Sequence, residues 1–490
     1  MGITLWVIIG VIVVFICVLI FRMLQFGERP FTQPGEAIPP IHLDRMVESL
    51  SAAVQCQTIS YHEGSIPDGS ALQQLHEVLI QQYPLVHSRL LLETVNKYGL
   101  LYTWQGNDSS LKPILFSAHQ DVVPVDPATS AQWTKSPFSG EVSDGFVWGR
   151  GSIDMKCQLV GILDAVETLL ENGFKPDRTL YLAFGHDEEV SGTEGAGKIA
   201  ELLKSRGVHL AAVWDEGNSI LDGVLPGITK PVGLVGIAEK GYMTVDFTVE
   251  GKPGHASTPP RQTAIGILAA ALSKLEASPM PADLTVFQKT MRSLGYLLPF
   301  GLRMGFANPW LFGRLLIKKL SDDPQTNAAI RTTTAVTMVS GGIKDNILPR
   351  QATAKVNFRI LPGQTVDQTL AEIKRIIADE RVQFSPVELS CWNPIPASPL
   401  DTPLYRQLQV AIQNTFDQVP VAPFIMLGGT DSRHYASISD AIYRFSPMMI
   451  NAVDLKRVHG IDERISLENL QRIVEFVLRL ILAWSKTSIG

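Results

Sequence analysis

Short β-rich runs alternate with amphipathic helical stretches through the first half of the chain, and this alternation restricts the fold more than any other feature. Residues 114–118, 179–184 and 210–214 have the composition of buried strands, whereas residues 155–171 and 193–206 have helical spacing. Strands that are joined through helices pair in parallel. The pattern therefore predicts an α/β fold with a mostly parallel, mixed sheet and helices on both of its faces.

The pattern changes near residue 241. Residues 241–250 alternate between apolar and polar side chains, which is typical of a half-buried antiparallel strand. Two more strands and two helices follow, at residues 331–339, 352–360, 263–277 and 366–378. After about residue 390 the chain returns to α/β character, and it closes with an amphipathic helix at 467–484. A smaller α+β domain is thus expected as an insertion in the larger one.

The N-terminus is strongly apolar. From Ile3 to Phe21 nearly every residue is apolar or glycine, which is long enough to cross a bilayer. A cleaved signal peptide is the alternative, but no basic region precedes the run and no small-residue cleavage site follows it. We therefore expect a single-pass N-terminal membrane anchor. Arg22 and Arg29 follow it, which favours a cytoplasmic main body, but two arginines leave the side of the membrane open.

Two further segments have unusual compositions. Residues 26–40 contain several prolines and little apolar periodicity, as expected of a tether. Residues 281–325 are both apolar and basic. Helices of this kind lie on a membrane surface or line an entrance for greasy substrates. The alternative is an ordinary helical pair that packs on its own domain.

Charge and cysteine content exclude two classes of protein. The formal net charge is −6 and no Lys/Arg run is present, so a nucleic-acid partner is not expected. The cysteines at positions 17, 56, 157 and 391 match neither a disulfide framework nor a thiolate zinc site.

Ionisable residues follow the predicted strands and precede the predicted helices. His119 and Asp121 come directly after the first strand, and Asp154 lies in a glycine-rich turn ahead of a helix. The others are Asp187-Glu188-Glu189 after the second strand, Asp215 at the end of the third, and His459 before the last helix. Taken singly, each has an ordinary interpretation as a helix cap, a solvated loop or a turn residue.

Taken together, these residues meet at one edge of the same predicted sheet, where open α/β sheets build their sites. Imidazoles and carboxylates without a thiolate suit a hydrolytic pair of zinc ions. Adjacent glutamates such as Glu188 and Glu189 can divide the work, one as metal ligand and the other as proton shuttle.

The motifs resemble those of the di-zinc carboxypeptidase/aminoacylase family. The resemblance rests on His119-x-Asp121, the turn 149–156, Asp187-Glu188-Glu189, Asp215-Glu216-Gly217, residues 251–257, Asn346-x-x-Pro349 and residues 358–363. Their order is kept over nearly the whole chain beyond the apolar N-terminus. Residues 331–335 and the long apolar insert make the branch of carboxypeptidase S and the N-acyl amino acid synthase/hydrolases the most similar one.

The resemblance implies two Zn²⁺ ions. Asp154 would bridge them, with His119 and Asp215 on one ion and Glu189 and His459 on the other.

The resemblance also implies the other site residues. Glu188 would be the general base, Asp121 would hold the His119 ring, and His255 of the smaller domain would stabilise the oxyanion. The implied substrate-binding residues are Asn346, Arg359, Gly429 and Thr430. Among them, Arg359 would offer a guanidinium fork to the substrate's carboxylate.

The implied function is a zinc-dependent hydrolase that cleaves the amide bond next to a free C-terminal carboxylate, as a carboxypeptidase or an N-acyl amino acid amidohydrolase. One alternative is a dipeptidase or small-acyl deacylase. Another is a catalytically dead, membrane-tethered binding protein, which would be expected to lack Glu188 or a metal ligand. The expected partners are a small-molecule or peptide substrate with a free carboxylate and the membrane. A homodimer is possible, but the oligomeric state stays open, because the smaller domain dimerises in many relatives and the insert could cover that surface here.

The expected division of the chain follows from these patterns. It is a transmembrane anchor at 1–25, a tether at 26–40, a catalytic zinc domain at 41–237 and 391–490, and an inserted α+β lid or dimerisation-type domain at 238–390 that contains the apolar helical insert 281–325.

Overall fold

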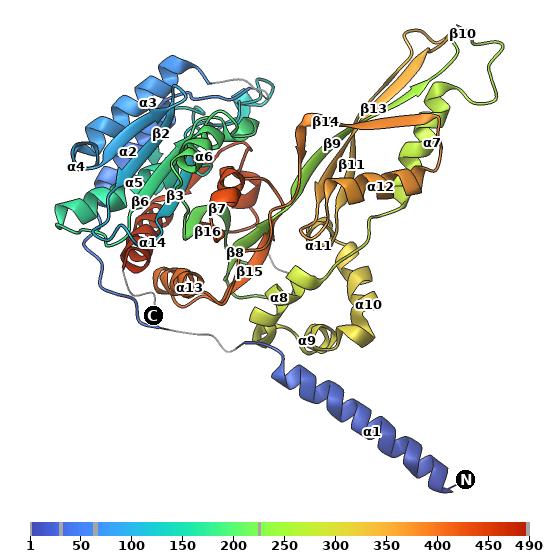
Figure 1. Cartoon of the computed structure of the whole chain (residues 1–490), viewed down its shortest axis with the longest axis horizontal. Coiled ribbons are helices and arrows are strands. Elements are labelled where there is room, and N and C mark those ends of the chain that lie inside the picture. The colour runs from blue at the N-terminus through green and yellow to red at the C-terminus, as the bar shows by residue number, and fades with distance from the viewer. Residues whose placement is uncertain (1, 29–32, 62–66, 224–226, 487–490) are drawn as a thin grey trace.

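The protein has a larger α/β domain, a smaller domain with long strands, and a helix that projects from both (Figure 1). This computed structural model describes residues 2–28, 33–61, 67–223 and 227–486. Arg29, on which the predicted orientation in the membrane partly depends, lies outside the described residues.

An eight-stranded mixed sheet forms the larger domain. Its order is β1 (Leu91–Val95), β2 (Gly99–Trp104), β6 (Leu180–Gly185), β3 (Ile114–His119), β7 (Ala212–Leu221), β16 (Ile442–Ile450), β8 (Val232–Glu239) and β15 (Val421–Met426). The central strands β6, β3, β7 and β16 pair in parallel, and β1 and β2 add an antiparallel edge. The predicted α/β fold with a mostly parallel, mixed sheet is confirmed.

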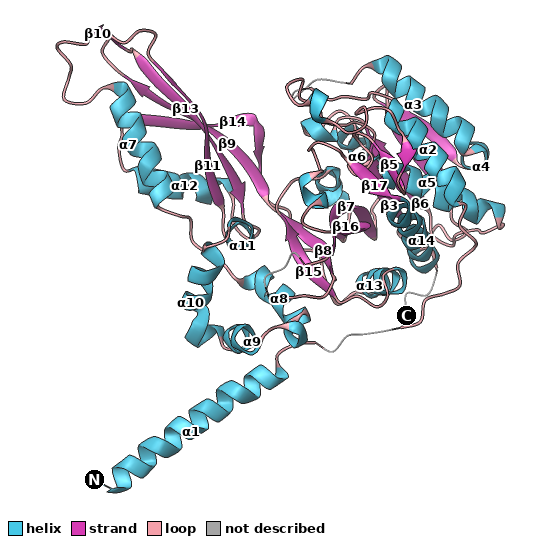
Figure 2. Cartoon of the chain, turned by 180° about the vertical axis from the view of Figure 1, so that it is seen from behind, coloured by secondary structure: helices cyan, strands magenta, loops and turns pink. Residues whose placement is uncertain are grey.

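Alternate side chains of the central strands enter two separate cores, because successive residues of a strand point to opposite faces. Ile114 and Phe116 of β3 face one core, and Leu115 faces the other. The first core is covered by α2 (Leu43–Gln55), α3 (Gly69–Gln82), α4 (Pro84–Arg89), α5 (Lys156–Glu171), α13 (Pro403–Thr415) and α14 (Leu467–Trp484). The second is covered by α6 (Ala196–Ser205) and the 3₁₀ segment η4 (Asp431–Ile438). Helices therefore lie on both faces of the sheet (Figure 2).

A four-stranded antiparallel sheet forms the smaller domain. Its order is β11 (Thr333–Gly341), β13 (Gln351–Ile360), β9 (Gly241–Glu250) and β14 (Val382–Trp392). Helices α7 (Ala264–Ala277) and α12 (Val366–Ile377) cover one face, where the apolar side of β9 is buried. At the far tip, β10 (Gly254–His255) pairs with β12 (Ile347–Leu348) (Figure 1).

The helical insert consists of α8 (Thr285–Ser293), α9 (Phe300–Ala307), α10 (Pro309–Ser321) and α11 (Pro324–Ile330). It packs on the larger domain, although the predicted division counts it with the smaller one. Phe287 of α8 contacts Phe424 of β15, and the hydroxyl of Thr290 donates to the carbonyl of Pro423 at 2.6 Å. The apolar residues that form the inner face of α8 pack on β8 and β15, which explains the difference.

The N-terminal helix α1 (Gly2–Gln25) leaves the rest of the molecule as an exposed apolar rod (Figure 1). It is long and apolar enough to cross a membrane, and this fits an anchor and a signal sequence alike. The segment after it follows the larger domain. The N–H of Gly35 donates to Oδ1 of Asn414 at 2.9 Å, and Arg479 donates to the carbonyl of Glu36.

Candidate metal centre

Three neighbouring strands deliver the acidic and imidazole side chains of the site. β3 lies between β6 and β7 and ends at His119. The 3₁₀ turn η2 (Glu188–Val190) follows β6 directly, and Glu216 belongs to β7. Because parallel strands end at the same edge of a sheet, these residues converge there.

Asp154 stands between two imidazoles. Its Oδ1 lies 3.2 Å from Nε2 of His119, and its Oδ2 lies 3.0 Å from Nε2 of His459. Each oxygen thus belongs to a different group of potential metal ligands. One group is His119, Asp154 and Glu216, and the other is Asp154, Glu189 and His459; a third group, without Asp154, is His119, Glu188 and Glu189. A carboxylate shared in this way is suited to bridge two ions.

The predicted ligand Asp215 does not belong to any of these groups. Its Oδ2 accepts the N–H of Ser432 at 2.8 Å, while Oε1 of the next residue, Glu216, lies 3.5 Å from Nε2 of His119. Adjacent residues of β7 point to opposite sides, so only one of the two acids can face His119. In this conformation Glu216 lies beside His119 and Asp215 does not, so the metal-binding role of Asp215 stays a prediction.

Asp121 is not one of the potential metal ligands, but it holds the residues around them in place. Its carboxylate lies 3.4 Å from Nδ1 of His119, and it accepts the N–H groups of Glu188 and Glu189 at 3.1 and 3.2 Å and the Ser60 hydroxyl at 2.6 Å. Burial opposes ionisation of Asp121, but the hydrogen bond and the charge of His119 outweigh burial and lower its pKa. The backbone carbonyl of Asp121, 3.0 Å from Nδ1 of His119, holds the imidazole together with the ionised carboxylate, and the carboxylate also fixes the Glu-Glu turn.

The glycine-rich turn before α5 is held by Glu463, which the sequence analysis missed. Its Oε1 accepts the N–H groups of Gly151, Ile153 and Asp154 at 2.9, 2.9 and 3.2 Å, and its other oxygen is paired with Arg150. No sequence pattern marks Glu463, because its partners lie more than 300 positions away.

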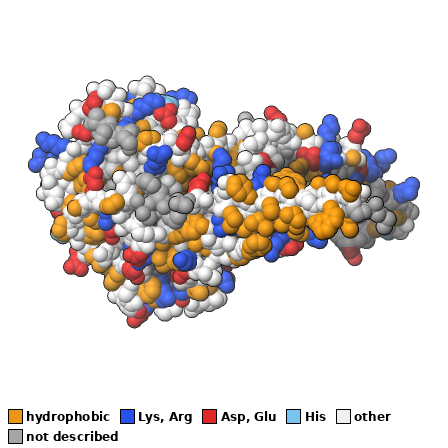
Figure 3. Space-filling model, turned by 90° about the horizontal axis from the view of Figure 1, so that it is seen from below, with side chains coloured by type: hydrophobic (Ala, Val, Ile, Leu, Met, Phe, Trp, Pro, Cys, Tyr) orange, Lys and Arg blue, Asp and Glu red, His pale blue; other side chains and the backbone are white. Residues whose placement is uncertain are grey.

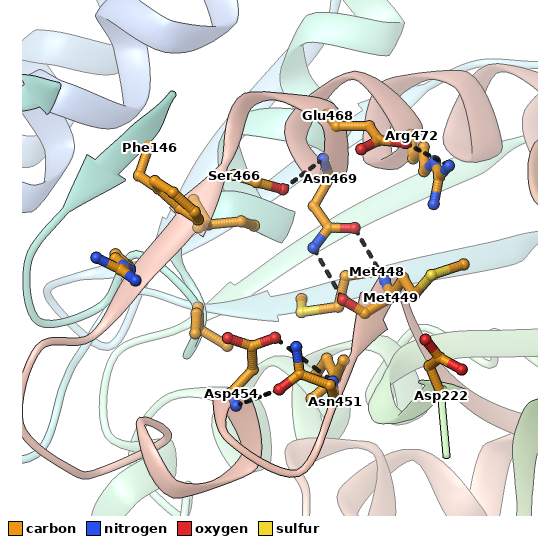
Figure 4. Close-up of a pocket in the computed structure, with 14 residues that line it drawn as sticks. Phe146, Asp222, Met448, Met449, Asn451, Asp454, Ser466, Glu468, Asn469 and Arg472 are labelled. Carbon is orange, nitrogen blue, oxygen red and sulfur yellow. Dashed lines mark hydrogen bonds and ion pairs between the residues drawn. The ribbon is translucent and has the colours of Figure 1, made fainter. Parts of the chain in front are cut away.

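The loop that carries His459 connects β16 to the short strand β17 (Arg464–Ser466), which leads directly into α14. Asn469 holds the two ends of this segment together (Figure 4). Its side-chain oxygen accepts the N–H of Met449 at 2.9 Å, and its side-chain nitrogen donates to the carbonyl of Met449 at 3.1 Å. Its backbone N–H donates to the hydroxyl of Ser466. Asn451 Oδ1 accepts the N–H of Asp454 at 3.0 Å in the same loop. The polar hollow of about 200 Å³ between these residues contains none of the proposed metal ligands, and we assign it a structural role.

The charge of the cluster favours bound cations. Asp154, Glu188, Glu189 and Glu216 face only two imidazoles. Burial raises the pKa of Glu188 and Glu216 well above the usual range, and the charge of Asp154 adds to this. Oε1 of Glu189 is buried and has no hydrogen-bond partner among the described residues. Such a surplus of buried carboxylate oxygens fits divalent metal ions, which would supply the missing positive charge.

Arg359 is part of a layered stack at the junction of the two domains. Its guanidinium lies 4.4 Å from the ring centroid of Tyr242, which stacks on Trp392 at 4.7 Å. The guanidinium of Arg433, from η4 in the larger domain, lies 4.4 Å from the other aromatic ring, Trp392. Neither arginine forms an ion pair within the described part of the chain.

The other two predicted residues of this region lie beside the stack. The hydroxyl of Thr430 contacts Oε2 of Glu239 at 3.3 Å, and that carboxylate is paired with buried Arg444. A Cβ on Gly429 would lie 3.3 Å from the Arg433 guanidinium, so glycine leaves room there. Burial, and then the charge of Arg359, lower the pKa of nearby Lys240 to about 7. The lowered pKa shows that positive charge is in excess in this region.

His255 and Asn346 are remote from the stack. Both are exposed and lie around the β10–β12 pair at the tip of the smaller domain. Arg359 pairs with Tyr242 at the other end of β13, eight residues from Gln351. At about 3.3 Å per residue that separation is about 26 Å. One chain in this conformation therefore does not bring His255 or Asn346 to the metal cluster.

A large apolar cavity of about 680 Å³ is lined by sequence neighbours of two cluster residues, although no cluster residue lines it itself. Its wall includes Gly217 and Val458, the immediate neighbours of Glu216 and His459. The opposite wall is formed by the helical insert, through Phe287, Met291, Leu298, Leu302, Phe306 and Leu316. The sequence left open whether this segment lies on a membrane, lines an entrance for apolar substrates or packs on its own domain; the structure makes it one wall of this cavity.

Comparisons with known proteins agree with this geometry. The model of peptidase family M20/M25/M40 matches residues 115–483. The chain is 44% identical to the N-fatty-acyl-amino acid synthase/hydrolase PM20D1 of Xenopus tropicalis over 89% of its own length and 85% of the relative. It is 39% identical to the probable carboxypeptidase S-like 2 of Dictyostelium discoideum (94% and 91% covered) and 31% identical to carboxypeptidase S of Saccharomyces cerevisiae (90% and 84% covered).

Solved structures share the fold. The metallo-carboxypeptidase Sso-CP2 of Sulfolobus solfataricus superposes with a TM-score of 0.64 at 16% identity, covering 90% of this chain and 99% of that one. The resemblance expected from the motifs is confirmed, and with it the expectation of a carboxypeptidase-like hydrolase of amide bonds. The chain belongs to the peptidase family M20/M25/M40.

Proposed function

We propose that the protein hydrolyses N-acyl amino acids whose acyl group is a long apolar chain, and that it does so with two zinc ions. The observation that carries this proposal is the apolar cavity beside the metal cluster. A dipeptide or an acetyl group would leave most of a 680 Å³ apolar space without contacts. The name of the Xenopus tropicalis relative, an N-fatty-acyl-amino acid synthase/hydrolase, supports the same substrate class.

In this proposal Asp154 bridges the ions, His119 and Glu216 hold one, and Glu189 and His459 hold the other. When bound, the ions polarise the scissile carbonyl and lower the pKa of the attacking water. Histidine and carboxylate ligands, with no thiolate among the described groups of ligands, are compatible with hydrolytic zinc.

Glu188 is the proposed general base. Its N–H is fixed by Asp121 at 3.1 Å, and its carboxylate lies next to His119 and Glu189. It accepts a proton from water as the water oxygen adds to the amide carbon. The same proton then passes to the leaving nitrogen as the carbon–nitrogen bond breaks, which releases a fatty acid and an amino acid.

The amino acid's carboxylate is proposed to bind at the aromatic stack. Arg359 and Arg433 stand on Tyr242 and Trp392 without an ion-pair partner among the described residues. Arg433 donates to the carbonyls of Ser191 and Thr430, and Nε of Arg359 donates to Oδ1 of Asn357. The Nη groups of Arg359, which form no hydrogen bond among the described residues, are the donors proposed to receive the carboxylate. Thr430 and Gly429 complete this wall. His255 and Asn346 lie at the tip of the smaller domain, too far away to reach the site of their own chain. We propose that a second copy of the chain supplies them.

The N-terminal helix is proposed to be a permanent single-pass anchor. Its last turn does not end in a free linker but is tied to the insert, since Arg22 donates to the carbonyl of Ala307 and Arg303 donates to that of Phe26. A segment that is removed after targeting would have no need of such contacts.

The test is a substrate panel with the purified, zinc-loaded full-length protein. One series varies acyl length at a constant amino acid, and each member is offered with a free or an amidated carboxylate. Since each buried methylene contributes about 0.8 kcal/mol, kcat/KM should rise about fourfold per methylene until the cavity is full. Amidation should cost about 30- to 1000-fold, and Arg359→Ala should cause the same loss on free acids only.

The panel also separates the alternatives. Preference for dipeptides or acetylated amino acids would contradict the proposed substrate and favour a dipeptidase or small-acyl deacylase. No turnover of any member by the zinc-loaded protein would favour a binding protein. Equal cleavage of free and amidated acids would reject Arg359 and Arg433 as the carboxylate site.

A further inference from the structure

The outer face of the helical insert is apolar and largely exposed among the described residues. Phe300 of α9 is 66% exposed, and Trp310 and Leu315 of α10 are 58% and 64% exposed. The inner faces of the same helices are buried through Phe306 and Leu316. Amphipathic helices of a globular domain normally expose their polar face, so an apolar outer face indicates a contact outside the chain.

The N-terminal helix shows what this face contacts. Phe15 of α1 packs edge-to-face on Trp310, with ring centroids 5.9 Å apart. Asn308, at the α9–α10 junction, donates to the carbonyl of Leu19 at 3.3 Å. Helix α1 and the insert therefore run side by side over the last part of the apolar rod.

The positions along α1 that contact the insert indicate how deep the insert would lie in a bilayer. If Arg22 marks the edge of the hydrocarbon layer, Phe15 lies seven residues further in. At 1.5 Å per residue this is about 10 Å. Trp310 and the α9–α10 corner then reach the depth at which interfacial helices bury their apolar side chains.

The charge of the helical insert also supports a contact with a membrane. From residue 285 to residue 321 the sequence contains no Asp or Glu, and its basic residues are Lys289, Arg292, Arg303, Arg314, Lys318 and Lys319. Arg314, Lys318 and Lys319 are exposed on α10. Seen from below, a hydrophobic band runs along the part of the molecule from which the N-terminal helix projects, with charged side chains beside it (Figure 3). Basic residues at the rim of an apolar face suit the anionic headgroups of a membrane.

The inner face of the same helices walls the cavity. Leu302 and Phe306 of α9 and Leu316 and Leu320 of α10 line it, whereas Phe300 and Leu315 point outward. Only the thickness of two short helices separates the cavity from the apolar outer face.

We propose that α9 and α10 form a membrane-seated collar, whose outer face lies among the lipids of an anionic leaflet and whose inner face receives acyl chains from that leaflet. The collar rests on the proposed function, because the substrate is taken to be a long-chain N-acyl amino acid dissolved in the bilayer. Its acyl chain moves from lipid to cavity without crossing water, and its amide reaches the metal cluster at the cavity's inner end.

The direct test uses the full-length protein in nanodiscs of phosphatidylcholine and phosphatidylserine. A photoreactive benzoylphenylalanine is placed at position 315 or, as the control, at position 91. Leu91 is equally exposed, at 61%, but lies on edge strand β1 of the larger domain. Lipid adducts are expected at position 315 and not at position 91. Adducts at neither position, or equally at both, would overturn the collar.

The functional test compares two substrates in the same nanodiscs, a long-chain N-acyl amino acid that partitions into the bilayer and an N-acetyl amino acid that stays in water. The double variant Phe300→Asp/Leu315→Asp should lose on the order of 10-fold in kcat/KM on the first and nothing on the second. Arg314→Glu/Lys318→Glu should remove the stimulation by phosphatidylserine. Leu91→Asp should change neither.

The possible results distinguish a failure of the collar proposal from a failure of the proposed function. If the unmodified protein cleaves neither substrate, the proposed function fails, and the adducts at position 315 still decide whether the insert enters the bilayer. If all variants cleave the bilayer substrate at the same rate, the function stands and the collar is rejected. A variant that loses both substrates reports damage to folding, and the lipid adducts then decide.

Discussion

The backbone N–H of Asp154 donates to Oε1 of Glu463 at 3.2 Å. The carboxylate of Asp154 is thus presented to both imidazoles by a residue that touches neither of them. Burial raises the pKa of Glu463 to about 7, and its pairing with Arg150 opposes this rise. The bridge between the proposed ions depends on this remote support.

We expect Glu463→Gln to weaken metal binding about 10- to 100-fold, as is typical for loss of a group that orients a ligand. The amide keeps one oxygen for the N–H groups of the turn but loses the negative charge and the oxygen that pairs with Arg150, so Asp154 would be less firmly placed. Competition with a chelator measures the affinity. Glu468→Gln is the matched control, because Glu468 is an exposed partner of Arg472 on α14. If Glu463→Gln leaves the metal affinity unchanged, the glycine-rich turn before α5 keeps its shape without the Glu463 carboxylate.

Glu188→Gln should keep both metals and lose about 10²- to 10⁴-fold in kcat, because it removes a general base and no ligand. Asp154→Ala should release the metals, since it removes the shared carboxylate. Metal content after dialysis and the rate on a long-chain substrate distinguish the two. Metal loss in the first variant with retention in the second would reverse the roles assigned to these residues.

Glu216→Ala should lower the metal content, whereas Asp215→Asn should leave it unchanged. The amide of Asn at position 215 can still accept the N–H of Ser432. The opposite result would restore Asp215 as the ligand that the family resemblance implies.

Much of this architecture follows from local patterns in the sequence. The period-two alternation predicts β9 with its observed bounds, Gly241–Glu250, and helical spacing predicts α14 at Leu467–Trp484. Histidine and acidic residues at strand ends were expected to meet, and the structure brings His119 together with Asp154. These features depend on neighbouring residues or on the rule that parallel strands end together.

The remaining features depend on long-range packing. A strand pattern cannot tell which of Asp215 and Glu216 faces the site, because the register of β7 against its neighbours decides that. Glu463 could not be found, because its role comes from a turn some 310 positions earlier. The insert was expected in the smaller domain because it lies there in sequence, but its apolar face fits β8 and β15.

Two inactive variants should restore activity when they are mixed. His255 lies at the tip of the smaller domain, and the edge strand β11 exposes Met338 and Val339, which suits pairing with a second copy. A mixed dimer of Glu188→Gln and His255→Ala would contain one complete site. Co-expression should therefore yield up to about a quarter of the normal activity. If both variants fold and bind metal but the mixture stays inactive, His255 acts within its own chain by closure of the smaller domain.

The last prediction concerns the length of the acyl chain. Leu316 is 6% exposed and lines the cavity from α10, whereas its neighbour Leu315 points outward. The larger side chain of Leu316→Trp should occupy space that the end of a long acyl chain would fill. Excluding about four methylenes, at about 0.8 kcal/mol each, should lower kcat/KM about 200-fold for the longest substrates and leave short ones unaffected.

Leu315→Trp is the matched control, because it adds the same side chain on the outer face and should leave the length profile unchanged. Thermal unfolding of both variants checks for overpacking, which typically costs 1–3 kcal/mol. A profile shifted toward shorter chains in Leu316→Trp alone would locate the acyl chain beside α10. Equal loss at every chain length would instead show that Leu316 supports the site through packing, and the acyl group would have to bind outside the cavity.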